Sequence, residues 1–233
     1  MSHARRAGPD AMEADRGADL SHVDTWLFDL DNTLYPLECG LAAQVDARLT
    51  EFMVELTGLP PAEALALQKR YLEEHGLTLI GLMKHHDVEP AGFNARFHDL
   101  PLDVLRRDER LARAVARLQG RRLIFTNADD VHTRRVLDAL GLAHLFHDVF
   151  HLISADYEPK PSAAAFERLI AAHDIRPAST AFFEDRAVNL APAAELGMTT
   201  VLVGAGAAPA PFVHHLAPDL AAFLASARVK EAT

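Results

Sequence analysis

Five short apolar runs, each rich in β-branched or aromatic residues, constrain the fold of this chain more than any other feature of the sequence. They cover residues 25–28, 122–125, 149–152, 180–183 and 199–203. Nearly continuous apolar character over four or five residues is typical of strands that are covered on both faces. The runs therefore predict a β-sheet that lies inside the molecule, between two layers of other elements.

Helical patterns separate the later runs. Segments 131–140, 162–173 and 189–196 repeat apolar residues at helical spacing, and Gly141 and Gly197 follow two of them, where a glycine commonly ends a helix. Alternation of strands and helices favours crossover connections, which make strands parallel and place helices on the faces of the sheet. We predict an α/β fold with a doubly wound parallel sheet.

The interval between the first and second runs departs from this alternation because it holds no convincing strand. Apolar residues at helical spacing predict helices over 38–56 and 61–74, and Gly76 and Gly81 bracket a short turn. A last helix, marked by Leu111, Val115 and Leu118, returns to the sheet. The predicted organisation is a disordered tail at residues 1–20, an α/β core at 21–35 and 119–233, and an inserted helical cap at 36–118.

Composition limits the functions open to the chain. A formal charge of −10 over 233 residues argues against binding a nucleic acid polymer, which needs clustered Lys and Arg, but allows a small phosphorylated ligand. Cys39 is the one cysteine, so no intrachain disulfide can form, which favours a reducing compartment. Residues 1–20 lack the apolar core of a secretory signal, and no apolar run approaches membrane-spanning length. We predict a cytoplasmic protein that does not bind membranes.

Two carboxylates, Asp29 and Asp31, come directly after the first apolar run. Side chains at positions i and i+2 of an extended segment point the same way, so both acids can address one ligand. One of them can attack as a nucleophile while the other moves protons. An acid pair can also merely cap a turn, and the functional interpretation therefore depends on the residues at the ends of the other runs.

Polar residues also follow the second, third and fourth runs. The second run ends in Thr126 and Asn127, the third is succeeded after a loop by Lys160, and the fourth ends in Glu184 and Asp185. In an open parallel sheet, ligands bind at the carboxyl ends of the strands. Crowded carboxylates need a cation, and oxygen-only ligands favour a hard ion such as Mg²⁺. The sequence thus predicts a Mg²⁺ site there.

For that site we predict three protein ligands for Mg²⁺: the carboxylates of Asp29 and Asp185 and the backbone carbonyl of Asp31. Thr126, Lys160 and backbone N–H groups can then hold the remaining oxygens of a phosphate. Each of these residues has a simpler interpretation in isolation, since Lys160 can be a solvated loop charge and Thr126-Asn127 an ordinary turn. Their occurrence in one order along the chain favours the shared site.

The segments DLDNT, TN, K-P and ED, in this order and with a helical insert after the first, resemble the haloacid dehalogenase superfamily of phosphohydrolases over residues 24–205. The resemblance implies a nucleophile at Asp29 that forms an aspartyl-phosphate. It implies that Asp31 protonates the leaving oxygen and then activates water. Further implied roles are phosphate binding by Thr126, Asn127 and Lys160, and metal binding by Asp185 with Glu184 as a second ligand or an orienting group.

The last motif departs from the commonest family pattern, Asp-Asp-Ser, because it reads Glu184-Asp185-Arg186. Glutamate keeps the charge, so we expect metal binding to survive, whereas the role of Arg186 stays open. Asn189 suits an amide that braces the acidic loop from behind. A dehalogenase that resembles this family would normally lack an acid at position 31, so Asp31 favours phosphoryl transfer.

Three further segments resemble the pyrimidine 5′-nucleotidase branch: Tyr35-Pro36, residues 71–82 and residues 125–128. That resemblance implies UMP or CMP as the substrate, with nucleoside and inorganic phosphate as products. The alternatives are a phosphatase for another small metabolite (a sugar phosphate, phosphoglycolate or pyridoxal phosphate), a phosphomutase, and a non-catalytic binding module with the same fold. The oligomeric state cannot be deduced from these residues.

Several other residues carry two interpretations. Asp129 and Asp130 are expected to cap the helix that begins there, with no catalytic part. Most of the thirteen histidines lack a ligand pattern and are expected to be structural. His132 is the exception because it opens a helix just past Thr126, and its role stays open. Side chains of the cap can either face the substrate or pack the cap: Tyr71, Thr78 and Met83.

Overall fold

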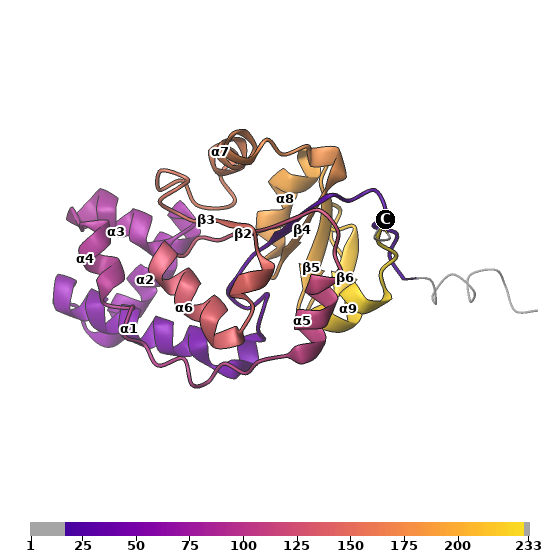
Figure 1. The fold of residues 1–233 in the computed structure, drawn as a ribbon. Helices are drawn as coiled ribbons and strands as arrows, with labels where there is room; N and C mark the ends of the chain where they lie inside the picture. The colour runs from indigo at the N-terminus through magenta and orange to yellow at the C-terminus, as the bar shows by residue number, and fades with distance from the viewer. Residues whose placement is uncertain (1–16, 231–233) are drawn as a thin grey trace, which may run out of the picture.

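The computed structural model describes residues 17–230. At its centre lies a six-stranded sheet in the order β3-β2-β1-β4-β5-β6, in which every pair of neighbouring strands is parallel (Figure 1). The strands are β1 (Thr25–Phe28), β2 (Arg121–Phe125), β3 (Asp148–Phe150), β4 (Thr180–Glu184), β5 (Thr199–Val203) and β6 (His215–Ala217). The predicted doubly wound parallel sheet is confirmed.

Alternate residues of the central strands enter two separate hydrophobic clusters. In β1, Trp26 and Phe28 belong to one cluster and Leu27 to the other. In β4, Phe183 and Phe182 are divided in the same way. Because successive side chains of a strand point to opposite faces, these two clusters are the two covered faces of the sheet.

Helices cover both faces. One face is packed by α5 (Glu109–Ala116), α6 (Asp130–Leu140) and α9 (Leu220–Ser226). The other face is packed by α7 (Ala163–His173) and α8 (Ala187–Glu195). Within residues 17–230 the chain also forms short 3₁₀ turns: η2 (Leu37–Cys39), η3 (Ala143–Leu145) and η4 (Pro177–Ser179).

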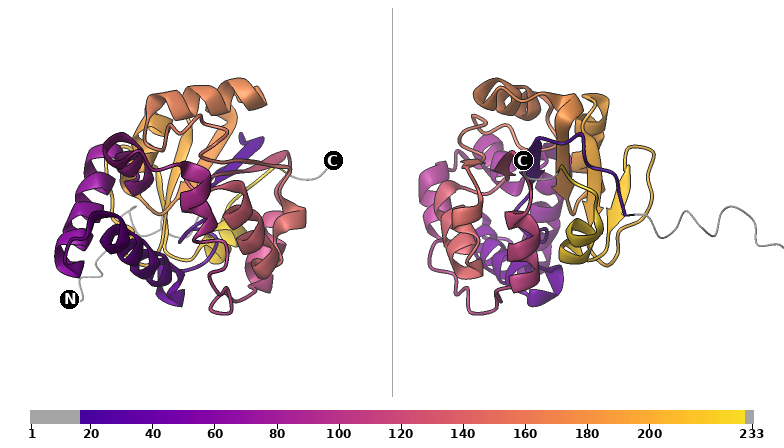
Figure 2. Two further views of the ribbon diagram at one scale, coloured as in Figure 1. Left: turned by 90° about the vertical axis from the view of Figure 1, so that its left-hand side faces the viewer. Right: turned by 45° about the vertical axis from the view of Figure 1, so that its right-hand side comes forward.

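The chain between β1 and η2 leads into a helical insert with its own hydrophobic cluster. The insert contains α1 (Leu41–Thr57), α2 (Pro61–His75), α3 (Thr78–His86) and α4 (Pro90–Ala95). These helices gather on one side of the molecule, at the left of Figure 1, and Figure 2 shows the same group from two further directions. The cap boundaries at residues 36 and 118 stay a prediction, although α5 packs on the sheet rather than in the cluster of the insert.

One predicted turn in the insert is wrong. Gly76 does end α2 in a left-handed conformation, but Gly81 lies inside α3 instead of closing a turn. A β-carbon at Gly81 would lie 2.4 Å from Cγ of Tyr71, so a glycine is required there for α3 to approach α2 closely. The same contact explains the position of the Tyr71 side chain, which packs between α2 and α3 and does not line the pocket.

Of the predicted disordered tail, residues 1–16 lie outside the described residues and residues 17–20 are ordered. The N–H of Leu20 donates to the carbonyl oxygen of Arg228 at 2.8 Å, and its side chain is fully buried. The prediction was wrong for these four residues because their partner lies more than two hundred positions away. Among the described residues, no helix combines the length and the apolar character that crossing a membrane requires.

Candidate active site

The predicted residues meet at the carboxyl ends of three adjacent strands. β1 pairs with β2 on one side and with β4 on the other, so the residues just past these strands lie next to one another. They are Asp29 after β1, Thr126 after β2, and Glu184 with Asp185 at the end of β4. This edge is also the point at which the strand order reverses direction, where open α/β sheets commonly bind ligands.

Lys160 occupies the centre of this group from the loop that connects β3 to α7. Its ammonium donates to Asp29 Oδ1 at 2.7 Å, to Glu184 Oε2 at 2.7 Å and to the carbonyl oxygen of Phe125 at 2.8 Å. Only 1% of the residue is exposed. A buried ammonium is stable only when it is paired, and these three acceptors match its three hydrogen atoms.

Asn127 fixes the backbone of Lys160. Its side-chain carbonyl accepts from the N–H of Lys160 at 2.8 Å, and its side-chain amide donates to the Lys160 carbonyl at 3.2 Å. Asn127 was predicted to bind phosphate, whereas both ends of its amide are here used to hold the lysine loop. The neighbouring Thr126 hydroxyl accepts from the N–H of Ala128 at 3.0 Å, which leaves its own hydrogen atom to donate into the pocket.

Three carboxylates form a cluster beside the lysine. Asp29, Glu184 and Asp185 each offer an oxygen atom, and these oxygens lie within 4.8 Å of one another. The pKa of Asp29 is raised to about 7, because burial and the Glu184 carboxylate outweigh the attraction of Lys160. Burial likewise raises the pKa of Glu184 and of Asp185. Concentrated negative charge of this kind favours binding of a proton or a cation.

Asp31 has a different environment from Asp29. His132 Nε2 lies 2.9 Å from its Oδ1, and the Tyr35 hydroxyl donates to the same oxygen at 2.6 Å. Burial opposes the charged form of Asp31, but His132 and Tyr35 outweigh it and hold its pKa below the usual range. Burial opposes the imidazolium in the same way, yet the Asp31 carboxylate raises the pKa of His132.

The role of His132 was open from the sequence, and the side chain of Tyr35 was not singled out. Asp129 caps α6 by accepting from the N–H of His132 at 3.0 Å, as expected for a helix start, and this cap sets the orientation of the first turn. Tyr35 comes four residues after Asp31, a spacing that gives no signal outside a regular helix. The one available signal was the position of His132 next to the segment that contains Thr126.

Arg186 and Asn189, which follow Glu184 and Asp185, differ in their hydrogen bonds. The backbone N–H of Arg186 donates to Glu184 Oε1 at 3.1 Å, which orients that carboxylate. Asn189 lies in the first turn of α8 and is 2% exposed, but its side-chain oxygen has no hydrogen-bond partner within residues 17–230. The predicted bracing of the loop by Asn189 stays a prediction.

A cavity of about 470 Å³ opens above this group and is shared with the insert. We call the polar base of the cavity the pocket floor; it consists of Asp29, Asp31, Thr126, Lys160, Glu184 and Asp185. We call its apolar side the insert wall; it consists of Val45, Leu49, Leu72, Leu77, Leu79, Phe93 and Phe97. Among the described residues of the insert that line the cavity, none is a lysine or an arginine.

A few polar groups interrupt the insert wall. Gln68, which is buried, donates to Asp46 at 3.1 Å and accepts from Thr50 at 2.9 Å. Of the three cap residues with two interpretations, Thr78 lines the cavity, whereas Tyr71 and Met83 do not. The cavity thus joins a charged floor to a largely apolar wall with isolated hydrogen-bonding groups.

Comparison with known proteins identifies a family and a curated relative. A family model described as haloacid dehalogenase-like hydrolase matches residues 23–197. Phosphate metabolism protein 8 of Saccharomyces cerevisiae is 28% identical over 193 residues, which is 76% of this chain and 60% of that protein. The chain therefore spans less than two thirds of the length of this curated relative.

Two solved structures share the fold. The HAD phosphatase from Thermococcus onnurineus superposes with a TM-score of 0.58 at 18% identity, over 89% of this chain and all of that one. The HAD-hydrolase YfnB from Bacillus subtilis, bound to magnesium, gives a TM-score of 0.55 at 17% identity, over 85% and 95% of the two chains. At these identities, the likeness establishes a common architecture.

Proposed function

Because the chain belongs to the haloacid dehalogenase-like hydrolases, we propose that it is a phosphomonoesterase that works through an aspartyl-phosphate at Asp29. The observation that carries this proposal is the pocket floor, where Asp29 belongs to the acid cluster and accepts from Lys160, and where Asp31 lines the same cavity. Asp31 also disfavours dehalogenation, in which no leaving alcohol has to be protonated.

The proposed reaction has two steps. The Asp29 carboxylate attacks phosphorus, and as the new O–P bond forms, the bond to the leaving oxygen breaks and Asp31 supplies that oxygen with a proton. Asp31 then removes a proton from water, the water attacks phosphorus, and Asp29 and inorganic phosphate are released. In the resting site Asp31 is ionised, but a bound phosphate dianion adds negative charge beside it and favours its protonation.

The acid cluster fits a magnesium ion. Its ligands would be Asp29, Asp185 and the backbone carbonyl of Asp31, with Glu184 as a further carboxylate, and this all-oxygen set suits a hard cation. When bound, the ion would neutralise negative charge on the phosphoryl group. Lys160 and the Thr126 hydroxyl would hold the other phosphoryl oxygens.

For the substrate, we propose a pyrimidine nucleoside 5′-monophosphate such as UMP or CMP. The insert wall offers Phe93 and Phe97 to a flat apolar ring, and Asp46 and Gln68 to hydroxyl or amide groups. The insert residues that line the cavity include no lysine or arginine, which supports an uncharged organic group against this wall, whereas Arg186 lines the cavity from the start of α8. Pyridoxal phosphate, which also carries a ring, is the second candidate.

Release of inorganic phosphate from a substrate panel, with Mg²⁺ present, tests the proposal. The panel consists of UMP, CMP, a sugar phosphate, phosphoglycolate and pyridoxal phosphate. We expect the highest kcat/KM for UMP or CMP. A higher value for sugar phosphates would contradict the nucleotidase assignment alone, whereas no hydrolysis of any member, with ligand binding retained, would favour a non-catalytic binding module. The cytoplasmic location stays a prediction from the sequence.

A further inference from the structure

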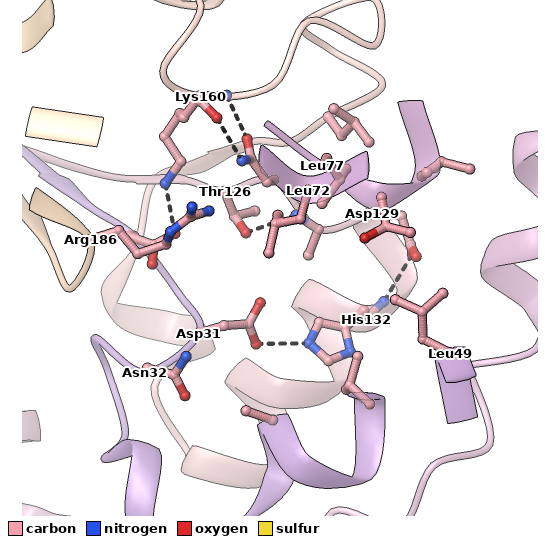
Figure 3. Close-up of a pocket in the computed structure, with 18 of the residues that line it drawn as sticks. Asp31, Asn32, Leu49, Leu72, Leu77, Thr126, Asp129, His132, Lys160 and Arg186 are labelled. Carbon is pink, nitrogen blue, oxygen red and sulfur yellow. Dashed lines mark hydrogen bonds and ion pairs between the residues drawn. The ribbon is translucent and has the colours of Figure 1, made fainter. Parts of the chain in front are cut away.

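Asp31 is held on one of its two oxygens only. Tyr35 and His132 both contact Oδ1, at 2.6 Å and 2.9 Å, and no hydrogen bond from the described residues reaches Oδ2. Figure 3 shows the carboxylate and the imidazole ring as direct neighbours joined by a dashed line, with Lys160 above them. The two oxygens of this carboxylate are therefore not equivalent.

We propose that His132 is a positioning residue, which together with Tyr35 fixes Oδ1 of Asp31 so that Oδ2 exchanges the proton with the leaving oxygen. This inference rests on the proposed phosphatase function. A phenol hydroxyl is a donor at neutral pH, and Oδ1 therefore serves as its acceptor. With Oδ1 accepting two hydrogen bonds, the proton that Asp31 carries is placed on Oδ2.

The position of His132 is itself well determined. The ring is buried, and the backbone of the residue is anchored where Asp129 accepts from its N–H. The hydroxyl of Thr133 donates to the Asp129 carbonyl at 2.7 Å and closes the same helical turn. The imidazole thus reaches Asp31 from a fixed helix start, which is the geometry expected of a group that orients another side chain.

The start of α6 is also connected to the insert. His98, which lies just after α4, has its Nε2 3.2 Å from Asp129 Oδ1, the same oxygen that caps α6 at His132. The helix start that carries His132 is therefore in contact with the insert that lines the pocket. This contact ties the orientation of the acid to a docked insert.

The experiment exploits the leaving group. An alcohol needs a proton as it departs, whereas 4-nitrophenolate departs without one, so the acid matters for the first and little for the second. We compare kcat/KM for UMP and for 4-nitrophenyl phosphate in the wild type, His132→Ala and His132→Gln. The value of kcat/KM reports steps up to departure of the leaving group and is independent of the later hydrolysis of the aspartyl-phosphate.

We expect His132→Ala to lower kcat/KM for UMP by about 30-fold to 100-fold and that for 4-nitrophenyl phosphate by less than about threefold. The amide of His132→Gln can donate to the same oxygen, so it should restore most of the UMP activity. His144→Ala, at an exposed histidine outside the pocket, serves as the matched control and should change neither value.

Two outcomes overturn the inference. Equal losses on both substrates in His132→Ala would show a role in folding or binding, and unchanged UMP turnover would show no role at all. Asp31→Asn separates this failure from that of the proposed function. If Asp31→Asn also affects both substrates equally, the assignment of Asp31 as the acid fails; if it affects UMP selectively while His132→Ala does not, only the role of His132 fails.

Discussion

The pocket floor is polar and mostly charged, whereas the insert wall is apolar and carries single polar groups. On the floor, Lys160 and its acceptors are held by hydrogen bonds of 2.7–2.8 Å. On the wall, side chains such as Leu72 and Leu77 offer only contact area. We infer that the floor determines the reaction and the wall selects the organic group of the substrate.

Removal of the nucleophile should have the largest effect, and it tests whether the floor determines the reaction. Asp29→Asn takes away one negative charge and almost no volume, so the fold should persist while kcat falls by about 10³-fold or more on every substrate. Phosphate release and circular dichroism provide the two measurements. Asp103→Asn, at an exposed acid outside the pocket, is the control. Near-normal turnover by Asp29→Asn would refute the covalent route.

Lys160→Met tests whether the floor also contributes to stability. Removing the ammonium leaves Asp29 and Glu184 buried without a counter-charge, which should lower the free energy of unfolding by about 3–5 kcal/mol. The loss should be smaller at acidic pH, because both carboxyls can then take up protons. Urea unfolding at two pH values measures it, with exposed Lys69→Met as the control. A pH-independent loss would contradict this electrostatic account.

A substitution on the insert wall should act on selectivity instead. Leu72→Lys places a cation where the wall has none, so it should raise kcat/KM for a nucleoside bisphosphate relative to UMP by about fivefold, with kcat for UMP nearly unchanged. Leu56→Lys lies in the same insert but outside the cavity, and should leave the ratio alone. A large fall in kcat for UMP would show that the wall also takes part in the chemistry.

Magnesium should stabilise the floor in a pH-dependent way. Because the pKa of Asp29 is raised to about 7, its protonated form stabilises the folded state at low pH, and this contribution is lost as the pH rises through 7. Added Mg²⁺ compensates for the ionised cluster, so we expect it to raise Tm by a few degrees at about pH 8 and by less at about pH 5.5. The reverse order in thermal unfolding would contradict this assignment of the metal site.

The sequence was sufficient to predict the floor because parallel topology brings strand ends together. Asp29, Thr126 and Glu184 each lie at the end of an apolar run, and their meeting needs no knowledge of side-chain packing. Lys160 is not at a strand end, but its place in the series of motifs identified it. The strands themselves were predicted within a few residues, except β6, whose three residues are too short to form a recognisable run.

The contacts that the sequence did not reveal depend on how elements dock. His132 reaches Asp31 only because α6 packs against the loop after β1, a relation that neither residue encodes locally. The same holds for Gly81, whose role depends on the approach of Tyr71 and not on its own conformation. Propensity and spacing describe single segments. They therefore cannot predict the hydrogen bond between His132 and Asp31, which are 101 positions apart.

All three hydrogen atoms of the Lys160 ammonium already have acceptors in this structure. A phosphoryl oxygen must therefore replace one of them, and the Asp29 oxygen becomes replaceable once formation of the aspartyl-phosphate, a mixed anhydride, has removed the charge of that carboxylate. The lysine then exchanges one anionic acceptor for another, and the number of its hydrogen bonds stays the same. For the resting enzyme the consequence is that the Lys160 ammonium has no free N–H for chloride or sulfate, so we expect these anions to bind weakly at this lysine.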